Sequence, residues 1–172
     1  CWDRGPRGDK VVEYLMQQPK VAFVWGNHDM AWLGACLGHP ALVCHVLRIS
    51  LRYGRLQQLE EGYGISLHAL EQLARAAYAT DPATGFLPKN PGLRDPQTLA
   101  RMHKAAAILQ QKLEGQVLLR HPEWNMADRR LLHRIHADGH LHLEDARLPL
   151  RDTHLPTLDS SDPYRLTPEE AV

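Results

Sequence analysis

The stretch that most constrains this chain is a run of five apolar residues, Val21–Trp25, followed directly by Gly26-Asn27-His28-Asp29. The run is too short for a helical core, and its unbroken apolar character is typical of a strand buried on both faces in a parallel sheet. Ligands of open α/β sheets bind at the carboxyl ends of such strands, where the chain turns from strand into helix. Asn27, His28 and Asp29 would lie at this place, so we expect the functional site there.

A second polar motif, Asp3-Arg4-Gly5-Pro6, opens the sequence. The residues between the two motifs fit one amphipathic helix from Gly8 to Gln18, which Pro19 ends. In a loop–helix–strand–loop unit, the crossover returns both loops to the same edge of a sheet. We therefore expect the two polar motifs to lie close together.

The two motifs resemble the second and third signature motifs of the calcineurin-like metallophosphoesterases. The second motif of that superfamily reads Gly-Asp-x-x-Asp-Arg-Gly, and Cys1 and Trp2 occupy its two variable positions. We therefore expect the sequence to start directly after a Gly-Asp pair and to be a piece of a longer chain. The other end agrees, because Thr167-Pro168-Glu169-Glu170 combines an N-cap hydroxyl, a proline at the first helical position and acids in the first turn. These residues predict a helix that starts at Thr167.

Between the two ends, the sequence predicts mainly helices. Apolar residues recur at helical spacing, and Ser66, Asp95-Pro96 and Asn125 provide helix starts. From Gly139 the apolar period changes to two, which predicts a β-hairpin up to about Leu150. The expected helices cover residues 29–36, 41–53, 66–79, 96–115 (ended by Gly115) and 125–136.

The middle of the chain resembles one branch of this superfamily, the class III fructose-1,6-bisphosphatases of bacteria. This resemblance implies hydrolysis of fructose 1,6-bisphosphate to fructose 6-phosphate and phosphate in gluconeogenesis. Two alternatives stay open: a phosphatase for phosphoproteins or dinucleoside polyphosphates on the same core, and a non-catalytic helical interaction module. The resemblance rests on Trp25-Gly26-Asn27-His28-Asp29, Val46-Leu47-Arg48-Ile49-Ser50, Tyr63-Gly64-Ile65-Ser66-Leu67, His103-Lys104, Lys112-Leu113-Glu114-Gly115, Arg120-His121-Pro122-Glu123, Asp162-Pro163-Tyr164 and Leu166-Thr167.

The fold that the resemblance implies is part of an α/β metallophosphoesterase core, in which strand–loop–helix elements belong to a layered β-sandwich. A large, mainly helical insertion and a small β-hairpin are added to this core. We divide the chain into residues 1–37 (part of the catalytic core), 38–138 (helical insertion) and 139–172 (hairpin and return loop). The first Asp-x-His motif and the late histidine motifs of the superfamily are missing from the sequence, so we expect this piece alone to be inactive.

The expected site is a dinuclear metal centre, for which manganese is the expected metal. Asn27 would supply a neutral oxygen ligand, although an asparagine at this place could instead cap the following helix. His28 would not bind metal but would act as a general acid towards the departing alkoxide, with Asp3 accepting a hydrogen bond from its other ring nitrogen. Arg4 would bind phosphate oxygens, unless it forms only a surface ion pair. We expect Asp29 to be a structural hydrogen-bond acceptor.

Basic residues recur at helical spacing in the segment that follows: His45, Arg48, Arg52 and Arg55. A solvated helix face is the simpler interpretation. The functional alternative is a second anchor for an anionic group, in which Arg48 and Arg52 bind the other phosphate of a sugar bisphosphate. Gly139-His140-Leu141-His142 imitates a metallophosphoesterase ligand motif, but its alternating pattern favours an ordinary hairpin.

Composition limits the remaining function classes. Lys and Arg together number 20, as do Asp and Glu, so the net charge is zero with neutral histidines and nothing steers the chain towards nucleic acid or a lipid surface. The sequence contains no apolar run of membrane-spanning length. Three cysteines are too few for a disulfide framework and favour a cytoplasmic protein. The sequence leaves the oligomeric state open, a homo-oligomer included.

Overall fold

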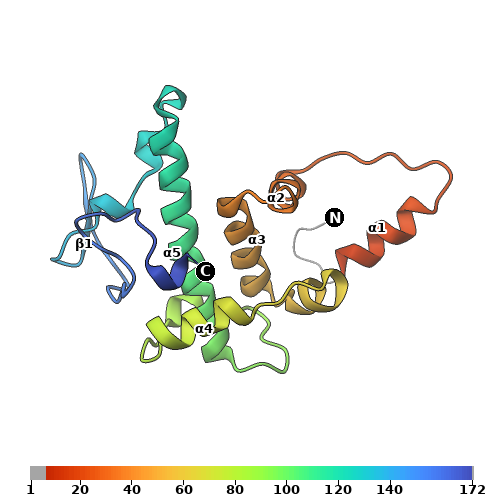
Figure 1. Cartoon of the computed structure of the whole chain (residues 1–172), viewed down its shortest axis with the longest axis horizontal. Coiled ribbons are helices and arrows are strands. Elements are labelled where there is room, and N and C mark those ends of the chain that lie inside the picture. The colour runs from red at the N-terminus through yellow and green to blue at the C-terminus, as the bar shows by residue number, and fades with distance from the viewer. Residues whose placement is uncertain (1–6, 172) are drawn as a thin grey trace.

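The structure is a computed structural model that describes residues 7–171. It is mainly helical, with one small antiparallel sheet (Figure 1). The longer elements are α1 (Gly8–Met16), α2 (Asn27–Cys36), α3 (Pro40–Tyr53), α4 (His68–Ala77), α5 (Pro96–Arg120), β1 (His140–His142) and β2 (Arg147–Pro149). Short helical turns connect them: η1 (Gln58–Gly62), η2 (Thr84–Phe86), η3 (Pro122–Trp124), η4 (Ala127–Arg129), η5 (Leu132–Arg134) and η6 (Pro168–Glu170).

The core lies where α2, α3 and α4 meet α5. Helix α3 packs along α5, α2 packs on α3, and α4 packs on α5, whereas α1 contacts η1 at its start and projects away from this body (Figure 1). Glycine allows one of these contacts, because a Cβ at Gly34 of α2 would overlap the Leu42 side chain of α3. The buried apolar side chains come from all four helices and the segment around η1: Ala31, Trp32, Val46, Leu51, Leu56, Leu59, Leu67, Ala74, Leu99, Met102 and Ala106.

Helix α5 starts as the sequence predicts but ends later. The Asp95 carboxylate accepts a hydrogen bond from the backbone N–H of Thr98 at 2.7 Å, and Pro96 occupies the first helical position. The prediction that Gly115 ends this helix is wrong, since α5 continues to Arg120. Gly115 instead faces the ring of Tyr164, at a place where a Cβ would overlap that ring. The missing side chain serves close packing here.

Two buried lysines of α5 hold the last part of the chain against the helix. Lys104 Nζ lies 2.5 Å from Asp81 Oδ2 and 2.7 Å from Asp152 Oδ2. Lys112 Nζ lies 2.6 Å from Glu170 Oε2 and donates to the carbonyl of Thr157 at 2.5 Å. A buried ammonium group is tolerated only when such partners replace its hydration. These contacts fix residues 152–170 relative to α5.

The predicted buried strand is wrong for the part of the chain that the structure describes. Val21–Gly26 is irregular and exposed, with 90% of Val24 and 67% of Trp25 accessible to solvent. A buried strand needs neighbouring strands to satisfy its backbone and side chains to cover its faces. Within residues 7–171 the strands are β1 and β2, which pair with each other. The apolar run therefore has no sheet to join among the described residues.

The other predicted elements divide into confirmed and wrong ones. The hairpin is confirmed, with Leu141 opposite Leu148. The helix starting near Ser66 is confirmed, and the Ser66 hydroxyl accepts the N–H of His68 at 3.3 Å. The helix predicted for residues 125–136 is wrong, because Asn125 adopts a left-handed conformation with φ 51° and only the short turns η4 and η5 follow. No helix formed by residues 7–171 combines the length and apolar character needed to cross a bilayer.

Candidate functional site

The first turn of α2 carries the central motif of the sequence. Gly26 is the extended residue before the helix, and its N–H donates to the Asp29 carboxylate at 2.9 Å. The structural role predicted for Asp29 is thereby confirmed. Asn27 is exposed and is the first residue of α2. The side chain that caps the helix is therefore that of Asp29 and not, as the alternative for Asn27 assumed, that of Asn27.

The opposite half of α2 anchors this turn. Ala31 and Trp32 are buried, and the Trp32 ring lies 5.5 Å from the ring of Tyr63, measured between centroids. Close packing of Gly34 against Leu42 holds the helix on α3. The motif is therefore presented at the surface by a helix whose following turn is fixed in the core.

His28 is half-buried and lies near His45 of α3. Burial lowers the pKa of His45, and the nearby charges of Arg48 and His28 act in the same direction, against the opposing effect of Glu114. A lowered pKa leaves His45 neutral at pH 7. The structure thus brings His28 and the basic residues of α3 into one neighbourhood, which sequence spacing alone does not predict.

Arg48 is held in place by the side chain of Gln110 on α5. Its Nε donates to Gln110 Oε1 at 2.7 Å, and Gln110 Nε2 lies 2.6 Å from Glu114 Oε1 and 3.2 Å from His45 Nδ1. Burial lowers the pKa of Arg48, and Glu114 acts against this effect. Arg48 is therefore a half-buried, oriented guanidinium, whereas the simpler interpretation described a freely solvated helix face.

Arg52 lies one turn further along α3 and is exposed. The loop before α5 approaches it, since the N–H of Lys89 donates to the Arg52 carbonyl at 2.8 Å and Lys89 Nζ lies 5.1 Å from the centre of the Tyr53 ring. His103 of α5 is buried behind this group and its Nδ1 lies 2.8 Å from the Phe86 carbonyl oxygen. Burial lowers the pKa of His103, and the charges of Arg48 and Arg52 add to this. We call Arg48, Arg52 and Lys89 the basic cluster.

Arg55 does not belong to the basic cluster, so the expectation that it shares one helical face with Arg48 and Arg52 is wrong. Helix α3 ends at Tyr53, and Gly54 adopts a left-handed conformation with φ 67°. Any Cβ at Gly54 would overlap the carbonyl oxygen of Asn90, so only glycine permits this turn. Arg55 follows the turn and is buried, with 3% of its surface accessible.

Two predicted site residues lie outside the described part of the chain, and two residues of the observed site were not predicted. Asp3 and Arg4 precede residue 7, so their placement beside His28 stays a prediction. Sequence reasoning missed Lys89 and Gln110, which join the site only through tertiary packing. No periodic or motif signal marks Lys89, since it lies in an irregular loop rich in proline and glycine.

A dinuclear metal centre needs several His, Cys, Asp or Glu side chains close together. Among residues 7–171, no group of three or more His, Cys, Asp or Glu side chains could hold a metal ion. The rings of His136 and His142 stack at 3.9 Å, and the Asp138 carboxylate lies 3.0 Å from His142 Nε2 and accepts from Arg147 at 2.7 Å. This arrangement holds the hairpin together. The described residues by themselves therefore do not fit a dinuclear metal centre.

Comparisons with known proteins identify the family. The sequence model described as Firmicute fructose-1,6-bisphosphatase matches residues 1–172. Similar curated proteins are named fructose-1,6-bisphosphatase class 3: that of Clostridium novyi (strain NT) is 44% identical over 98% of this chain and 26% of its own length, and that of Listeria innocua is 45% identical over 98% and 27%. The corresponding protein of Saccharophagus degradans is 44% identical over 98% of this chain and 29% of its own length.

This chain spans about a quarter of the length of the curated relatives it matches. No solved structure matches it, so the metallophosphoesterase fold of the complete protein stays a prediction. The family model matches the sequence itself, over all of its residues, so membership of the family does not depend on a known fold. The chain belongs to the Firmicute fructose-1,6-bisphosphatase family.

Proposed function

We propose that this chain carries part of the active site of an enzyme that hydrolyses fructose 1,6-bisphosphate to fructose 6-phosphate and phosphate, a step of gluconeogenesis. The observation that carries the proposal is the arrangement of α2 and α3, in which His28 lies beside a helix that carries Arg48 and Arg52. A sugar bisphosphate has two anionic groups at opposite ends. A proton donor next to oriented guanidinium groups suits such a substrate.

His28 is the proposed proton donor. Hydrolysis breaks the bond between phosphorus and the sugar oxygen, and the oxygen that leaves takes up a proton. The neutral state of His45 helps here, because a charged imidazole on α3 would repel a proton held on His28. We propose that Asp3 accepts a hydrogen bond from the other ring nitrogen of His28, which favours the charged imidazole.

The substrate phosphates would be bound by arginines from two parts of the chain. We propose that Arg4 binds the phosphate that is transferred and that Arg48 and Arg52 bind the other one. Arg48 suits this role because Gln110 already fixes its guanidinium group through Nε at 2.7 Å, so less side-chain entropy is lost on binding. Lys89 brings a further positive charge to the same end of α3.

A divalent metal is the cofactor that the phosphatase family implies, and we propose manganese. Two divalent ions supply an activated hydroxide and neutralise phosphoryl oxygens when bound. The exposed amide of Asn27 would be one ligand. Since residues 7–171 do not form a metal centre, the other ligands would come from outside this range.

The complete protein would be cytoplasmic on this proposal. Cys36 and Cys44 are free thiols in the structure, which suits a reducing compartment. A homo-oligomer is compatible with the proposal, and sedimentation of the complete protein measures it directly.

The test compares three substrates with the purified complete protein and added manganese. We expect turnover of fructose 1,6-bisphosphate with a kcat/KM at least ~10-fold higher than that of a phosphopeptide or an aryl phosphate, because only the bisphosphate engages the basic cluster. A preference for the phosphopeptide would favour the phosphoprotein-phosphatase alternative. Absence of hydrolysis of all three, with the fold intact, would favour the helical interaction module.

A further inference from the structure

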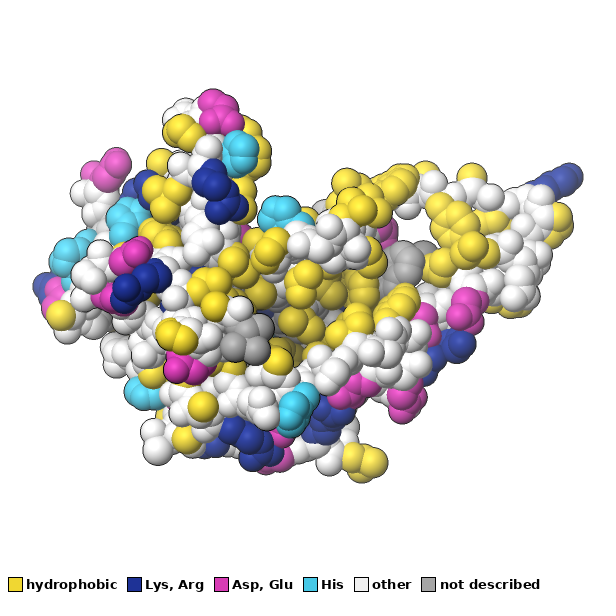
Figure 2. Space-filling view, in the orientation of Figure 1, with side chains coloured by type: hydrophobic (Ala, Val, Ile, Leu, Met, Phe, Trp, Pro, Cys, Tyr) yellow, Lys and Arg dark blue, Asp and Glu magenta, His cyan; other side chains and the backbone are white. Residues whose placement is uncertain are grey.

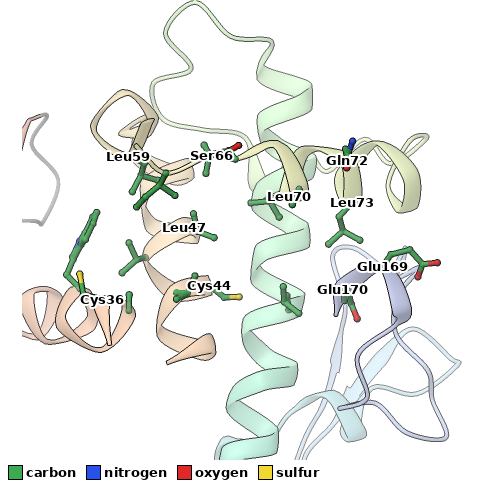
Figure 3. A pocket seen from close by; sticks show the side chains of 18 of the residues that line it. Cys36, Cys44, Leu47, Leu59, Ser66, Leu70, Gln72, Leu73, Glu169 and Glu170 are labelled. Carbon is green, nitrogen blue, oxygen red and sulfur yellow. The ribbon is translucent and has the colours of Figure 1, made fainter. Parts of the chain in front are cut away.

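An open apolar groove lies beside α5. It has a volume of about 590 Å³ and is bordered by α2, α3, α4 and η6 (Figure 3). Its lining is mainly apolar and includes Trp32, Val43, Leu47, Leu70, Leu73 and Leu109. Figure 2 shows hydrophobic side chains gathered over this hollow face of the molecule. An apolar surface of this extent marks a place where another structural element packs.

The turn η6 lies at the rim of the groove and has the features of an α-helix start. Thr167 Oγ1 accepts the N–H of Glu170 at 3.3 Å, and the Glu170 carboxylate accepts the N–H of Thr167 at 2.9 Å. Pro168 occupies the first helical position. A reciprocal capping box with a proline at this position is a signature of a helix N-terminus. An isolated turn of this kind contributes little stability by itself.

Buried contacts fix the position of η6. Lys112 of α5 is completely buried and lies 2.6 Å from the Glu170 carboxylate, of which 1% is accessible. Glu169 and Glu170 both line the groove (Figure 3). The proximity of Glu170 to α3 is also evident at Cys44, where burial raises the thiol pKa to about 11 and Glu170 adds to the effect. A helix that begins at η6 would therefore begin inside the border of the groove.

We infer that the residues after Val172 in the complete protein continue η6 as an α-helix and that the apolar face of this helix fills the groove between α3, α4 and α5. Three observations select this occupant over a second copy or a foreign protein. The capping box starts a helix at the rim, Lys112 fixes that start, and the curated relatives are about four times as long as this chain.

The inference also says what the helix contains. Residues three and four positions apart share a helical face. Because Glu170 faces the groove, positions three and four residues beyond it, and those one further turn along, would carry apolar side chains. The gene sequence gives a first test. Polar residues at all these positions, or a stop codon directly after the codon for Val172, would overturn the inference.

The experiment is hydrogen–deuterium exchange of the complete protein, followed by mass spectrometry. We expect the amides that follow Val172 to exchange at least ~10-fold more slowly than an unstructured segment, because helical amides packed on a core are protected. Val43 lines the groove and is 36% accessible, so Val43→Asp places a charge in the groove. This change should abolish the protection of the segment and leave that of α5 in place.

The matched control is Leu119→Asp, at an exposed position of α5 outside the groove lining. It should leave the protection of the segment unchanged. If Val43→Asp fails to fold, Val43→Thr provides a milder polar change. The alkylation rate of Cys44 provides a second readout, because Cys44 lines the groove and should react faster when the helix leaves it.

Three results would overturn the inference. The first is fast exchange of the segment in the unchanged protein. The second is protection of the segment that Val43→Asp and Leu119→Asp affect equally. The third is protection of α3 and α4 that depends on protein concentration, which would assign the groove to a second copy. None of these readouts involves phosphate hydrolysis, so the proposed function can fail or stand separately.

Discussion

Gly115 of α5 lies directly against the ring of Tyr164, so closely that a Cβ at position 115 would overlap the ring. The tyrosine cannot move aside easily, because it is 6% accessible, its hydroxyl lies 2.9 Å from His133 Nδ1, and its backbone carbonyl accepts from Gln116 at 2.8 Å. The pair therefore joins α5 to the last part of the chain. This contact reverses the usual effect of replacing a glycine inside a helix.

Gly115→Ala should destabilise the fold by about 1–3 kcal/mol, because overlap with the ring outweighs the gain of up to ~1 kcal/mol that alanine brings to a helix interior. Urea unfolding followed by the helical circular-dichroism signal measures the difference. Gly85→Ala is the control, since nothing lies within 4 Å of a Cβ at that position. Stabilisation by Gly115→Ala would show that Tyr164 yields.

The buried pair of Lys104 and Asp81 predicts a loss of stability in acid. Burial raises the pKa of Asp81, but hydrogen bonds from Lys104, His154 and the N–H of Ala83 outweigh it, so the pKa lies below its ordinary value of 3.8. A carboxyl with a lowered pKa in the folded state stabilises above its unfolded pKa, and this contribution is lost as the pH falls through the folded-state pKa.

Asp81→Asn should therefore cost about 3–5 kcal/mol at pH 7, the range for removing one partner of a buried pair. The difference from the unchanged chain should shrink as the pH falls below about 4, where the unchanged chain loses the same contribution. Urea unfolding across this pH range tests both statements. Asp152→Asn is the matched control and should cost less, because the Asp152 side chain is 29% accessible. Equal costs at every pH would contradict the prediction.

His28 and Asn27 are adjacent in α2 but should behave differently in the complete enzyme. His28→Asn should lower kcat by ~10²–10⁴-fold, as expected for loss of a general acid, and leave the metal content nearly unchanged. Asn27→Ala should reduce metal occupancy, measured by elemental analysis of the purified protein. The assignment would be reversed if His28→Asn emptied the site and Asn27→Ala left it full.

The basic cluster should matter most for a substrate with two phosphates. Arg48→Ala combined with Arg52→Ala should raise KM for fructose 1,6-bisphosphate more than for an aryl phosphate, since each desolvated contact to a charged group contributes about 1.5–3 kcal/mol. Steady-state kinetics of the complete enzyme measures both constants. Arg75→Ala is the control, because Arg75 of α4 is exposed and paired with Glu71 at 2.7 Å. Equal effects on the two substrates would return Arg48 and Arg52 to a surface role.

The 172-residue chain alone should be neither a phosphatase nor a tight metal binder. Two divalent ions ~3.5–4 Å apart repel each other, and one neutral amide from Asn27 does not offset that repulsion. Manganese titration by calorimetry, together with hydrolysis of an aryl phosphate, tests this expectation. Micromolar binding with metal-dependent turnover would contradict it and would direct attention to His140 and His142.

Local signals in the sequence predicted several helix starts but not the helix expected from Asn125. The start of α5 at Asp95-Pro96 and the capping box at Thr167 depend on residues within one turn, and both are confirmed. The role of Gly115 could not be predicted, because its partner Tyr164 is distant in the sequence. The apolar run Val21–Trp25 indicates that the segment is suited to burial but does not say which surface covers it.

The candidate site was predictable to a similar extent. The motif of α2 and the spacing of Arg48 and Arg52 are visible in the sequence, whereas Lys89 and Gln110 reach the site through packing of other segments on α3. The end of α3 at Gly54, which separates Arg55 from the basic cluster, depends on the approach of the Asn90 carbonyl oxygen. Contacts of this kind leave no periodic signal.

The exposed run Val21–Trp25 also has a consequence for the order of folding. Helices α2 and α3 are joined by a short connection and can pack on each other early, since contacts between neighbours in the sequence form fastest. An apolar run that stays exposed while the chain is being made can promote self-association. Lys20 before it and Asp29 after it place charges at both ends, which is how natural sequences restrain such segments. Asp29 also accepts the N–H of Gly26, so one carboxylate serves both the start of α2 and the charged border of the apolar run.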